Sequence, residues 1–270
     1  MLLVLGLAGC RTGRNYTTPE GPRFAGAPRV APLPYRSETT TLRVVSFNIA
    51  FGVEVDSAIA LLASEPALRG ADILLLQEMD EAGTRRVADA LGHWYVYYPS
   101  VFHLRTRRHF GNAVLSRWPI VDDKKIILPH LSRFARTQRI ATGATILVGR
   151  TPVRVYSTHL ATPMDISPAA RRRQLRAILA DAARYRHVVL GGDMNDHRVG
   201  YLARDMGYSW PTRRGPPTTR FGRWDHIFFK GLGSPASESS GTLRHAGGAS
   251  DHLPVWAVAL LAPEPLAHHQ

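Results

Sequence analysis

Short apolar runs, rich in Val, Ile, Tyr and Phe, recur along the chain and are separated by polar segments. A run of about 4–8 residues with β-branched and aromatic side chains is typical of a strand rather than a helix. Several runs are almost continuously apolar, which favours strands covered on both faces. The pattern therefore predicts strands at residues 42–49, 72–78, 93–98, 111–116, 141–148, 153–159, 187–193, 224–229 and 254–260.

Apolar residues at helical spacing occupy some of the segments between these runs. They predict helices at residues 56–69, 81–91 and 168–185. The last of these has one apolar face, and arginines opposite it are predicted to form a solvated face: Arg171, Arg172, Arg173 and Arg176. With no internal repeat and no linker between the runs, we expect one α/β domain of two packed sheets flanked by helices.

The amino terminus differs from the rest of the chain. Residues 1–9 are apolar and are followed directly by Cys10, the only cysteine in the sequence. Such a stretch is too short to span a bilayer, which takes about 20 apolar residues, but it suits a secretory signal. Leu7-Ala8-Gly9-Cys10 resembles the lipobox of bacterial lipoproteins, in which the cysteine carries the lipid. The alternative is an ordinary buried segment with a free cysteine.

The lipobox interpretation sets expectations for location and domain organisation. Residues 1–10 are expected to be a lipoprotein-type signal with lipidation at Cys10, so that the protein is exported and anchored in the cell envelope, at the periplasmic face or the outer membrane. Residues 11–40 mix Pro with Gly, Arg, Thr and Ser and show no period, which predicts a flexible tether. The folded domain is expected at residues 41–262, followed by a loose tail at residues 263–270.

Composition narrows the class of protein. The 270 residues are 44% hydrophobic, which excludes wholesale disorder, and a single cysteine excludes an intramolecular disulfide. A total of 34 Lys and Arg against 21 Asp and Glu gives a net charge of +13. This charge favours anionic partners, although an arginine-rich composition accounts for it equally well.

Polar residues at the ends of the apolar runs carry the candidate chemistry. The runs end at, or just before, residue types that metal and phosphate chemistry uses: Asn48, Glu78, His159, Asp193 with Asn195, Asp225, and Asp251 with His252. Taken singly, each such residue more often caps a turn or satisfies a buried hydrogen bond. Their coincidence in one β-rich chain predicts a single polar cleft where the strand ends converge.

The motifs SFNI, LLQE, GNAVLS, STHL, GGDMN, RWDHIF and SDHLPV, in this order, make the chain similar to the endonuclease/exonuclease/phosphatase superfamily over most of residues 42–260. The resemblance implies a four-layer α/β/β/α sandwich of two packed mixed sheets flanked by helices, and it assigns residues 41–262 to such a domain. It also implies a Mg²⁺-dependent hydrolase of phosphate esters, with Mn²⁺ as the alternative metal. The activity implied first is that of a phosphodiesterase or nuclease.

The resemblance implies a metal site and an activated water. Glu78 matches the principal Mg²⁺ ligand of the family, and Asn48 and Asp251 match further positions around the metal. This set agrees with the preference of a hard cation for oxygen ligands. Asp193 matches the residue that activates the attacking water, and Asn195 is expected to help hold that water or a phosphate oxygen.

The histidines are implied to act on the phosphate. His159 and His252 match the two histidines of the nuclease branch and are expected to hydrogen-bond the phosphate oxygens. Asp225 matches the carboxylate that pairs with the second of them, fixing its tautomer and raising its pKa. His226, inside the RWDHIF strand, is expected to be a framework residue.

Two loops, residues 100–111 and 210–224, combine arginines with aromatic residues, a combination that suits phosphate clamping and base stacking. Arg220 and Arg223 of the second loop, together with Arg139 and Asn112, are the predicted substrate-binding residues; an ordinary arginine-rich surface is the alternative for the loops. The expected partner is an anionic phosphoester, with nucleic acid first, acted on by a monomer. A lipid-directed phosphoesterase, similar to a sphingomyelinase or an inositol-phosphate phosphatase, is the alternative function. A non-catalytic binding module is disfavoured because all the catalytic residue types are present.

Overall fold

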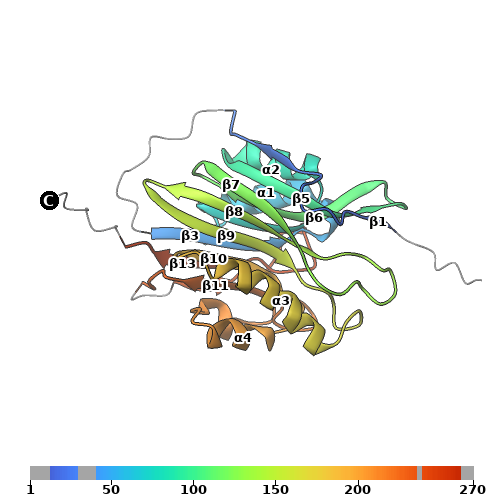
Figure 1. Ribbon diagram of the computed structural model, residues 1–270. Helices are drawn as coiled ribbons and strands as arrows, with labels where there is room; N and C mark the ends of the chain where they lie inside the picture. The colour runs from blue at the N-terminus through green and yellow to red at the C-terminus, as the bar shows by residue number, and fades with distance from the viewer. Residues whose placement is uncertain (1–12, 30–40, 236–238, 263–270) are drawn as a thin grey trace, which may run out of the picture.

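The strands of the computed structural model, which describes residues 13–29, 41–235 and 239–262, form two sheets packed face to face (Figure 1). The first has the order β1 (Gly13–Asn15), β5 (Trp94–His103), β6 (Arg108–Ser116), β4 (Ile73–Met79), β3 (Thr41–Asn48), β13 (Val255–Leu260) and β12 (Ser240–Thr242), and β2 (Phe24–Gly26) also pairs with β5. The second has the order β11 (Asp225–Lys230), β10 (Val188–Asp193), β9 (Thr151–His159), β8 (Ile140–Val148) and β7 (Ile120–Ile127).

Both sheets are mixed, and their parallel pairs bring the candidate residues to one end. β3 pairs with β4 and β9 pairs with β10 in parallel, whereas the other pairs are antiparallel. In the parallel register Asn48 lies opposite Gln77, next to Glu78, and Asp193 lies opposite His159. The carboxyl ends of these four strands therefore carry the polar residues that the sequence placed there.

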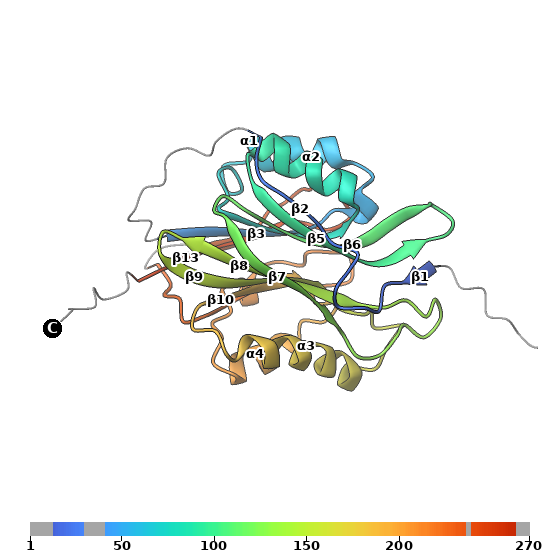
Figure 2. The same cartoon turned by 45° about the horizontal axis from the view of Figure 1, so that its top comes forward.

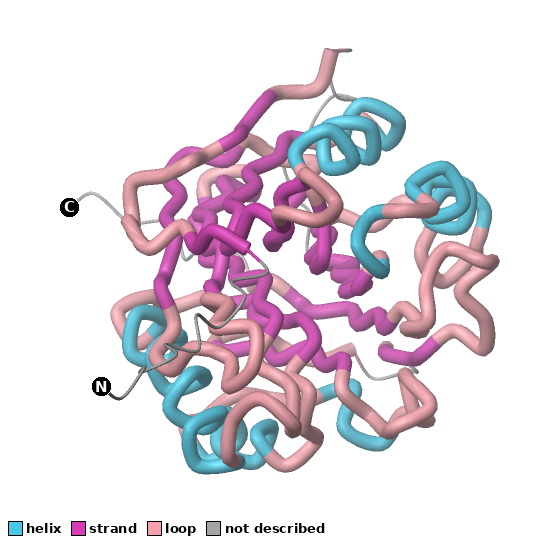
Figure 3. Tube along the Cα trace, turned by 90° about the vertical axis from the view of Figure 1, so that its right-hand side faces the viewer, coloured by secondary structure: helices cyan, strands magenta, loops and turns pink. Residues whose placement is uncertain are grey.

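Helices cover the outer face of each sheet. α1 (Val55–Ser64) and α2 (Glu81–Leu91) lie over the first sheet, and α3 (Pro168–Ala182) and α4 (Val199–Asp205) lie over the second (Figure 2). Short 3₁₀ helices occupy Ala50–Gly52 and Pro211–Arg214. The end view in Figure 3 has the strands at the centre and the helices outside them, which confirms the predicted four-layer sandwich.

Three apolar clusters hold these layers together. One lies between the sheets and includes Leu75, Val155 and Ile227, all without exposed surface. A second lies under α1 and α2, and a third lies under α3 and α4. Full burial of one such aliphatic side chain contributes about 1.5–3 kcal/mol, so the sheets form a rigid frame for the residues at their ends.

The predicted elements agree with the structure except at a few positions. Each predicted strand is present, and the helices predicted at residues 56–69 and 168–185 are shorter, ending at Ser64 and Ala182. The pattern did not predict β7, β12 or α4. Within the described residues, no helix is both long enough and apolar enough to span a bilayer.

The tether predicted for residues 11–40 is wrong for residues 13–29. Strands β1 and β2 pair with β5, and the guanidinium of Arg23 donates two hydrogen bonds of 2.7 and 2.6 Å to the carboxylate of Asp123. The folded body therefore extends to residue 13. The predicted signal at residues 1–10 with Cys10 and the predicted tail at residues 263–270 lie outside the described residues.

Candidate active site

A cavity of about 300 Å³ lies where the strand ends of the two sheets meet. It is lined by the predicted residues Glu78, Arg139, His159, Asp193, Asn195 and His252. Aromatic residues from loops and strands complete the lining: Phe51, His103, Phe110 and Trp224. The structure thus brings side chains that are far apart in the sequence into one cleft, as the strand-end pattern predicted.

Glu78 reaches the cavity through an irregularity in β4. The β4–β6 register shifts between Leu76 and Met79, and Glu78 has a φ of 59°, which is strained for a residue with a side chain. Its carboxylate accepts hydrogen bonds from the Asn48 side-chain amide at 3.1 Å and from the Phe51 backbone N–H at 3.1 Å. Burial raises the pKa of Glu78, because the positive charges near its carboxylate do not compensate for the loss of solvent.

Asp193 is the centre of the polar cluster. Its Oδ2 accepts a hydrogen bond from Asn48 Nδ2 at 3.2 Å and lies 3.2 Å from His159 Nε2 and 3.7 Å from His252 Nε2. Its Oδ1 accepts from the backbone N–H of Asn195 at 2.9 Å. Burial and the nearby charge of Asp225 raise the pKa of Asp193, which makes it a stronger base than an exposed aspartate.

His252 and Asp225 form the predicted pair. His252 Nδ1 lies 2.9 Å from Asp225 Oδ2, and both side chains are buried. Burial alone would lower the pKa of His252, but the Asp225 carboxylate outweighs it and raises that pKa to about 10. His252 is therefore a cation at neutral pH, with its Nε2–H directed toward Asp193 and the cavity.

His159 has the opposite character. Burial and the nearby Arg139 charge lower the pKa of His159 well below its ordinary value, so its ring is neutral at neutral pH. Nε2 faces the Asp193 carboxylate and therefore carries the proton, whereas Nδ1 has no hydrogen-bond partner and lies 3.7 Å from Glu78 Oε1. The lone pairs of His159 Nδ1 and Glu78 Oε1 thus face each other across 3.7 Å with no proton between them.

Arg139 supplies a buried positive charge. Its guanidinium packs over the ring of Phe110 at 5.7 Å from the centroid, and its Nε and Nη1 atoms have no hydrogen-bond partner among the described residues. Because Arg139 lines the cavity with Glu78 and Asp193, these unused donors are available to an anion that enters it.

Several predicted residues do not line this cavity. Asp251 is exposed beside His252, and Arg220 and Arg223 are exposed on the loop before β11, where Arg220 packs over Phe221. The side chain of Asn112 is buried and donates to the Ile140 carbonyl at 2.9 Å, which ties β6 to β8. The roles assigned to Asp251, Arg220, Arg223 and Asn112 remain predictions.

His226 has the framework position expected for it. The ring is buried, its Nδ1 accepts from Trp210 Nε1 at 3.2 Å, and its Nε2 lies 3.0 Å from the Arg223 carbonyl. Burial lowers the pKa of His226 to about 3, so this ring stays neutral and structural.

The predicted solvated face of α3 is wrong at its first arginine. Arg171 is buried, donates to the Ala161 carbonyl at 2.8 Å, and pairs with Asp196 at 3.0 Å. One turn on, Gln174 accepts from the Ala161 N–H at 3.0 Å. These side chains brace the loops that follow β9 and β10, and the i, i+3 spacing of Arg171 and Gln174 is the sequence signal for a shared helix face.

The donor set fits a divalent metal. Asp193, Asp225 and His252 offer ligand atoms within 4.8 Å of one another, but Asp225 and His252 are already bonded to each other. The Glu78 carboxylate, with the Asn48 side chain bonded to it and the unpartnered Nδ1 of His159 facing it, has the excess of lone pairs that a bound cation would neutralise. The Glu78 carboxylate supplies the oxygen ligands that a hard cation prefers. Asn48 presents its amide nitrogen to this carboxylate, and its Oδ1 accepts from the Ala50 N–H at 3.1 Å, so its role as a metal ligand stays a prediction.

A rigid α/β/β/α frame that presents a buried carboxylate, a histidinium and an unpartnered guanidinium to one cavity suits the hydrolysis of phosphoesters. A family comparison agrees: residues 45–252 match the Endonuclease/Exonuclease/phosphatase family, and the chain belongs to it. Enzymes of this family depend on divalent metals.

Solved structures share the fold at low sequence identity. An endonuclease/exonuclease/phosphatase from Beutenbergia cavernae is 22% identical, with a TM-score of 0.64 over 84% of this chain and 73% of that one. The human Nocturnin catalytic domain with bound sulfate is 18% identical, with a TM-score of 0.61 over 82% and 95%. Sphingomyelinase C from Streptomyces griseocarneus is 18% identical, with a TM-score of 0.59 over 83% and 100%. A search of the curated proteins found no match.

Proposed function

We propose that this hydrolase is a Mg²⁺-dependent phosphodiesterase that cleaves nucleic acid. The observation that carries the proposal is the position of the buried Asp193 carboxylate between His159 and His252, in a cavity that also holds the unpartnered guanidinium of Arg139. A base and two kinds of cationic donor around one cavity suit the attack of water on a phosphodiester.

In this proposal each residue has one task. The carboxylate of Asp193 takes a proton from water as the water oxygen bonds to phosphorus. The bond from phosphorus to the leaving oxygen breaks with its electron pair on that oxygen, which takes up a proton from solvent. The Nε2–H of protonated His252 and the free N–H groups of Arg139 donate hydrogen bonds to the phosphate oxygens, where negative charge increases. Asp225 keeps His252 oriented and charged.

Glu78 would hold the metal through its carboxylate, with Asn48 beside it, and Mn²⁺ would be the alternative to Mg²⁺. When bound, the cation supplies charge stabilisation to the phosphate. The role of the protein in this part of the site is to keep the Glu78 carboxylate buried and fixed, through the Asn48 amide and the Phe51 N–H.

Aromatic and basic groups beside the cavity favour nucleic acid. Trp224 lines the cavity, and the ring of Phe221 stacks on it with centroids 5.3 Å apart and an interplanar angle of 14°. The guanidinium carbon of Arg220 lies over the Phe221 ring at 4.5 Å from its centroid. An exposed aromatic pair with an arginine next to it suits base stacking and phosphate contact along a strand.

The test is hydrolysis by the full chain of bis(p-nitrophenyl) phosphate, single- and double-stranded DNA, and RNA, with and without Mg²⁺. We expect Mg²⁺-dependent turnover and a rise in Tm on addition of Mg²⁺, because a cation relieves the buried charge of Glu78. Asp193→Asn should abolish turnover, whereas Asp205→Asn, an exposed residue at the end of α4, should not. Turnover that is independent of metal or that survives in Asp193→Asn would refute the proposal.

A lipid phosphoester is the second candidate substrate. Phe51 lines the cavity and is exposed, and large apolar side chains are also exposed elsewhere on the described surface: Leu104, Phe134, Met164 and Phe221. Such side chains suit contact with a membrane surface, and one protein of the same fold is a sphingomyelinase C. Mg²⁺-dependent cleavage of sphingomyelin vesicles with no cleavage of nucleic acid would favour this candidate.

We further propose export and lipid anchoring through Cys10, on the basis of the Leu7-Ala8-Gly9-Cys10 sequence. The protein would then act from the envelope as an anchored monomer. Membrane fractionation of Cys10→Ala in a bacterial host is the test. Loss of membrane association is expected, and unchanged fractionation would refute the anchor.

A further inference from the structure

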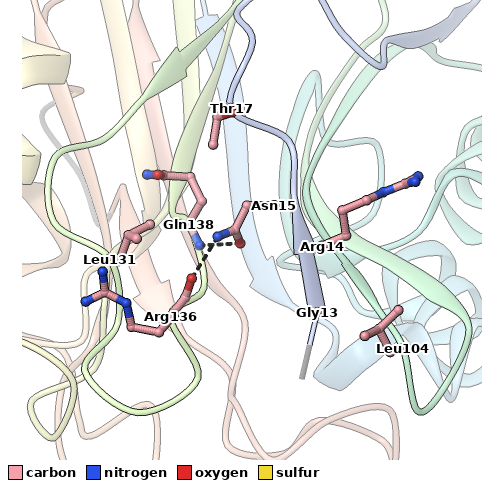
Figure 4. Close-up of a pocket in the computed structure, with 8 residues that line it drawn as sticks. All are labelled: Gly13, Arg14, Asn15, Thr17, Leu104, Leu131, Arg136 and Gln138. Atoms are coloured by element: carbon pink, nitrogen blue, oxygen red, sulfur yellow. Dashed lines mark hydrogen bonds between the residues drawn. The ribbon is translucent and has the colours of Figure 1, made fainter. Parts of the chain in front are cut away.

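A second cavity, of about 580 Å³, adjoins the catalytic one. Three segments line it: residues 13–17, the tip of the β5–β6 hairpin, and residues 131–138 (Figure 4). Gln138 lines both cavities. Its neighbours in the chain line one cavity or the other: Thr137 and Arg139 line the catalytic cavity, and Arg136 lines the second. A substrate held at Arg139 therefore needs only a short extension to reach the second cavity.

The amino-terminal wall of this cavity is fixed in place. β1 pairs with β5, and the side chain of Asn15 bonds to the backbone on both sides of Thr137: its Nδ2 donates to the Arg136 carbonyl at 2.7 Å, and its Oδ1 accepts from the Gln138 N–H at 2.9 Å. Residues 13–29 precede the region that matches the family, which begins at residue 45. The wall therefore comes from residues that lie outside the range matched by the family model.

The lining chemistry selects an anion with an apolar part. Arg14 and Arg136 line the cavity, no acidic residue lines it, and neither arginine forms an ion pair with any described residue. Leu104 and Leu131 contribute apolar surface to the same walls. Arg14 lies beside Leu104 on one side of the cavity, and Arg136 lies beside Leu131 on the other (Figure 4). Two separated guanidiniums without a carboxylate suit an extended chain with more than one phosphate, and the leucines suit the sugars or bases attached to it.

We propose that this cavity is a second substrate subsite that binds neighbouring nucleotides of the strand cleaved at Asp193, with Arg14 and Arg136 on separate phosphates of that strand. The proposal rests on the proposed nuclease function. It predicts that the protein prefers strands of several nucleotides over esters that fill the catalytic cavity alone.

The experiment compares Arg14→Gln, Arg136→Gln and the double variant with Arg69→Gln in the full chain. Arg69 is exposed and precedes β4, at the end of that strand opposite to Glu78, so its substitution removes the same charge away from both cavities. Binding of a fluorescent eight-nucleotide single-stranded DNA without added metal is measured by anisotropy at low salt. Kinetics on bis(p-nitrophenyl) phosphate with Mg²⁺ are measured in parallel.

Each subsite substitution is expected to raise the Kd for the oligonucleotide about two- to fivefold, and the double variant further, whereas Arg69→Gln leaves it unchanged. Hydrolysis of the small ester should be unchanged in all variants. An equal effect of Arg69→Gln, or no effect of the double variant, would overturn the subsite. So would variants that lose binding to phosphatidylglycerol vesicles while they keep binding to the oligonucleotide.

The two proposals fail separately in this design. A parent protein that does not hydrolyse the small ester refutes the proposed function, and the binding comparison still decides whether the second cavity holds a nucleotide. Conversely, an active parent whose oligonucleotide binding is insensitive to Arg14 and Arg136 keeps the function and loses the subsite.

Discussion

Gly192 is the residue at which a single methyl group should do most damage to the active site. It precedes Asp193 in β10, has a φ of 143°, and packs against β9 so closely that a Cβ atom would lie 1.8 Å from the Thr158 carbonyl oxygen. Non-bonded carbon and oxygen atoms do not approach closer than about 3 Å, so Gly192→Ala must separate the two strands by about 1 Å.

The expected magnitudes follow from this displacement. The next register pair along the two strands is Asp193 with His159, whose contact of 3.2 Å would be broken. A shift of about 1 Å at a reacting group lowers kcat by about 100-fold. Overpacking together with the unfavourable φ costs about 2–5 kcal/mol, which corresponds to a fall in Tm of roughly 5–15 °C for a domain of this size.

The assay is kcat on bis(p-nitrophenyl) phosphate with Mg²⁺, with Tm measured by circular dichroism. Gly92→Ala is the matched control: Gly92 has a φ of 69° at the end of α2, and no atom lies within 4 Å of its would-be Cβ. It should lower stability by about 1 kcal/mol and leave kcat unchanged. A folded Gly192→Ala protein that keeps kcat within about threefold of the parent would refute the argument.

Two further predictions concern charge. Asp225→Asn keeps a hydrogen-bond partner beside His252 Nδ1 but removes the carboxylate that raises the His252 pKa to about 10. We therefore expect this pKa to fall in an NMR titration and kcat to drop by about 10–1000-fold in steady-state kinetics. An unchanged kcat would contradict the role given to the pair. Burial lowers the pKa of Lys125 to about 8, below its value in the unfolded chain, so between pH 8 and about 10.5 the unfolded state binds more protons and stability should rise with pH. Urea unfolding at pH 7.5 and 9.5 should show this rise in the parent and a smaller rise in Lys125→Met, and equal pH dependence of the two proteins would contradict it.

The missed strand β7 differs in one physical respect from the strands that the sequence predicts. Strands that are buried on both faces can be recognised in the sequence by their continuous apolar residues. By contrast, β7 contains the charged run Asp122, Asp123, Lys124 and Lys125. β7 is the edge strand of its sheet, where charged side chains discourage pairing with other chains. Each charge finds a partner from another part of the chain, such as Asp181 for Lys124, and no local pattern encodes those partners.

The candidate site shows the same division. Asn48, Glu78, His159 and Asp193 could be predicted because strand ends meet at sheet edges, a rule that needs no knowledge of side-chain partners. The bracing role of Arg171 could not be predicted in the same way, because an arginine on a helix face is exposed unless another segment covers it. Here the cover comes from the loops after β9 and β10.

The amino-terminal segment explains why composition misplaces the start of the folded body. Residues 13–29 have no period and contain Pro19, Pro22 and Pro28, which favours a tether when the segment is considered alone. Their order comes from tertiary contacts instead, since β5 offers an edge for β1 and β2, and Lys125 binds the Gly21 carbonyl. A chain cut at residue 30 would lose these contacts and one wall of the second cavity. The segment that composition assigns to a tether is therefore part of the folded body, and it forms one wall of the second cavity.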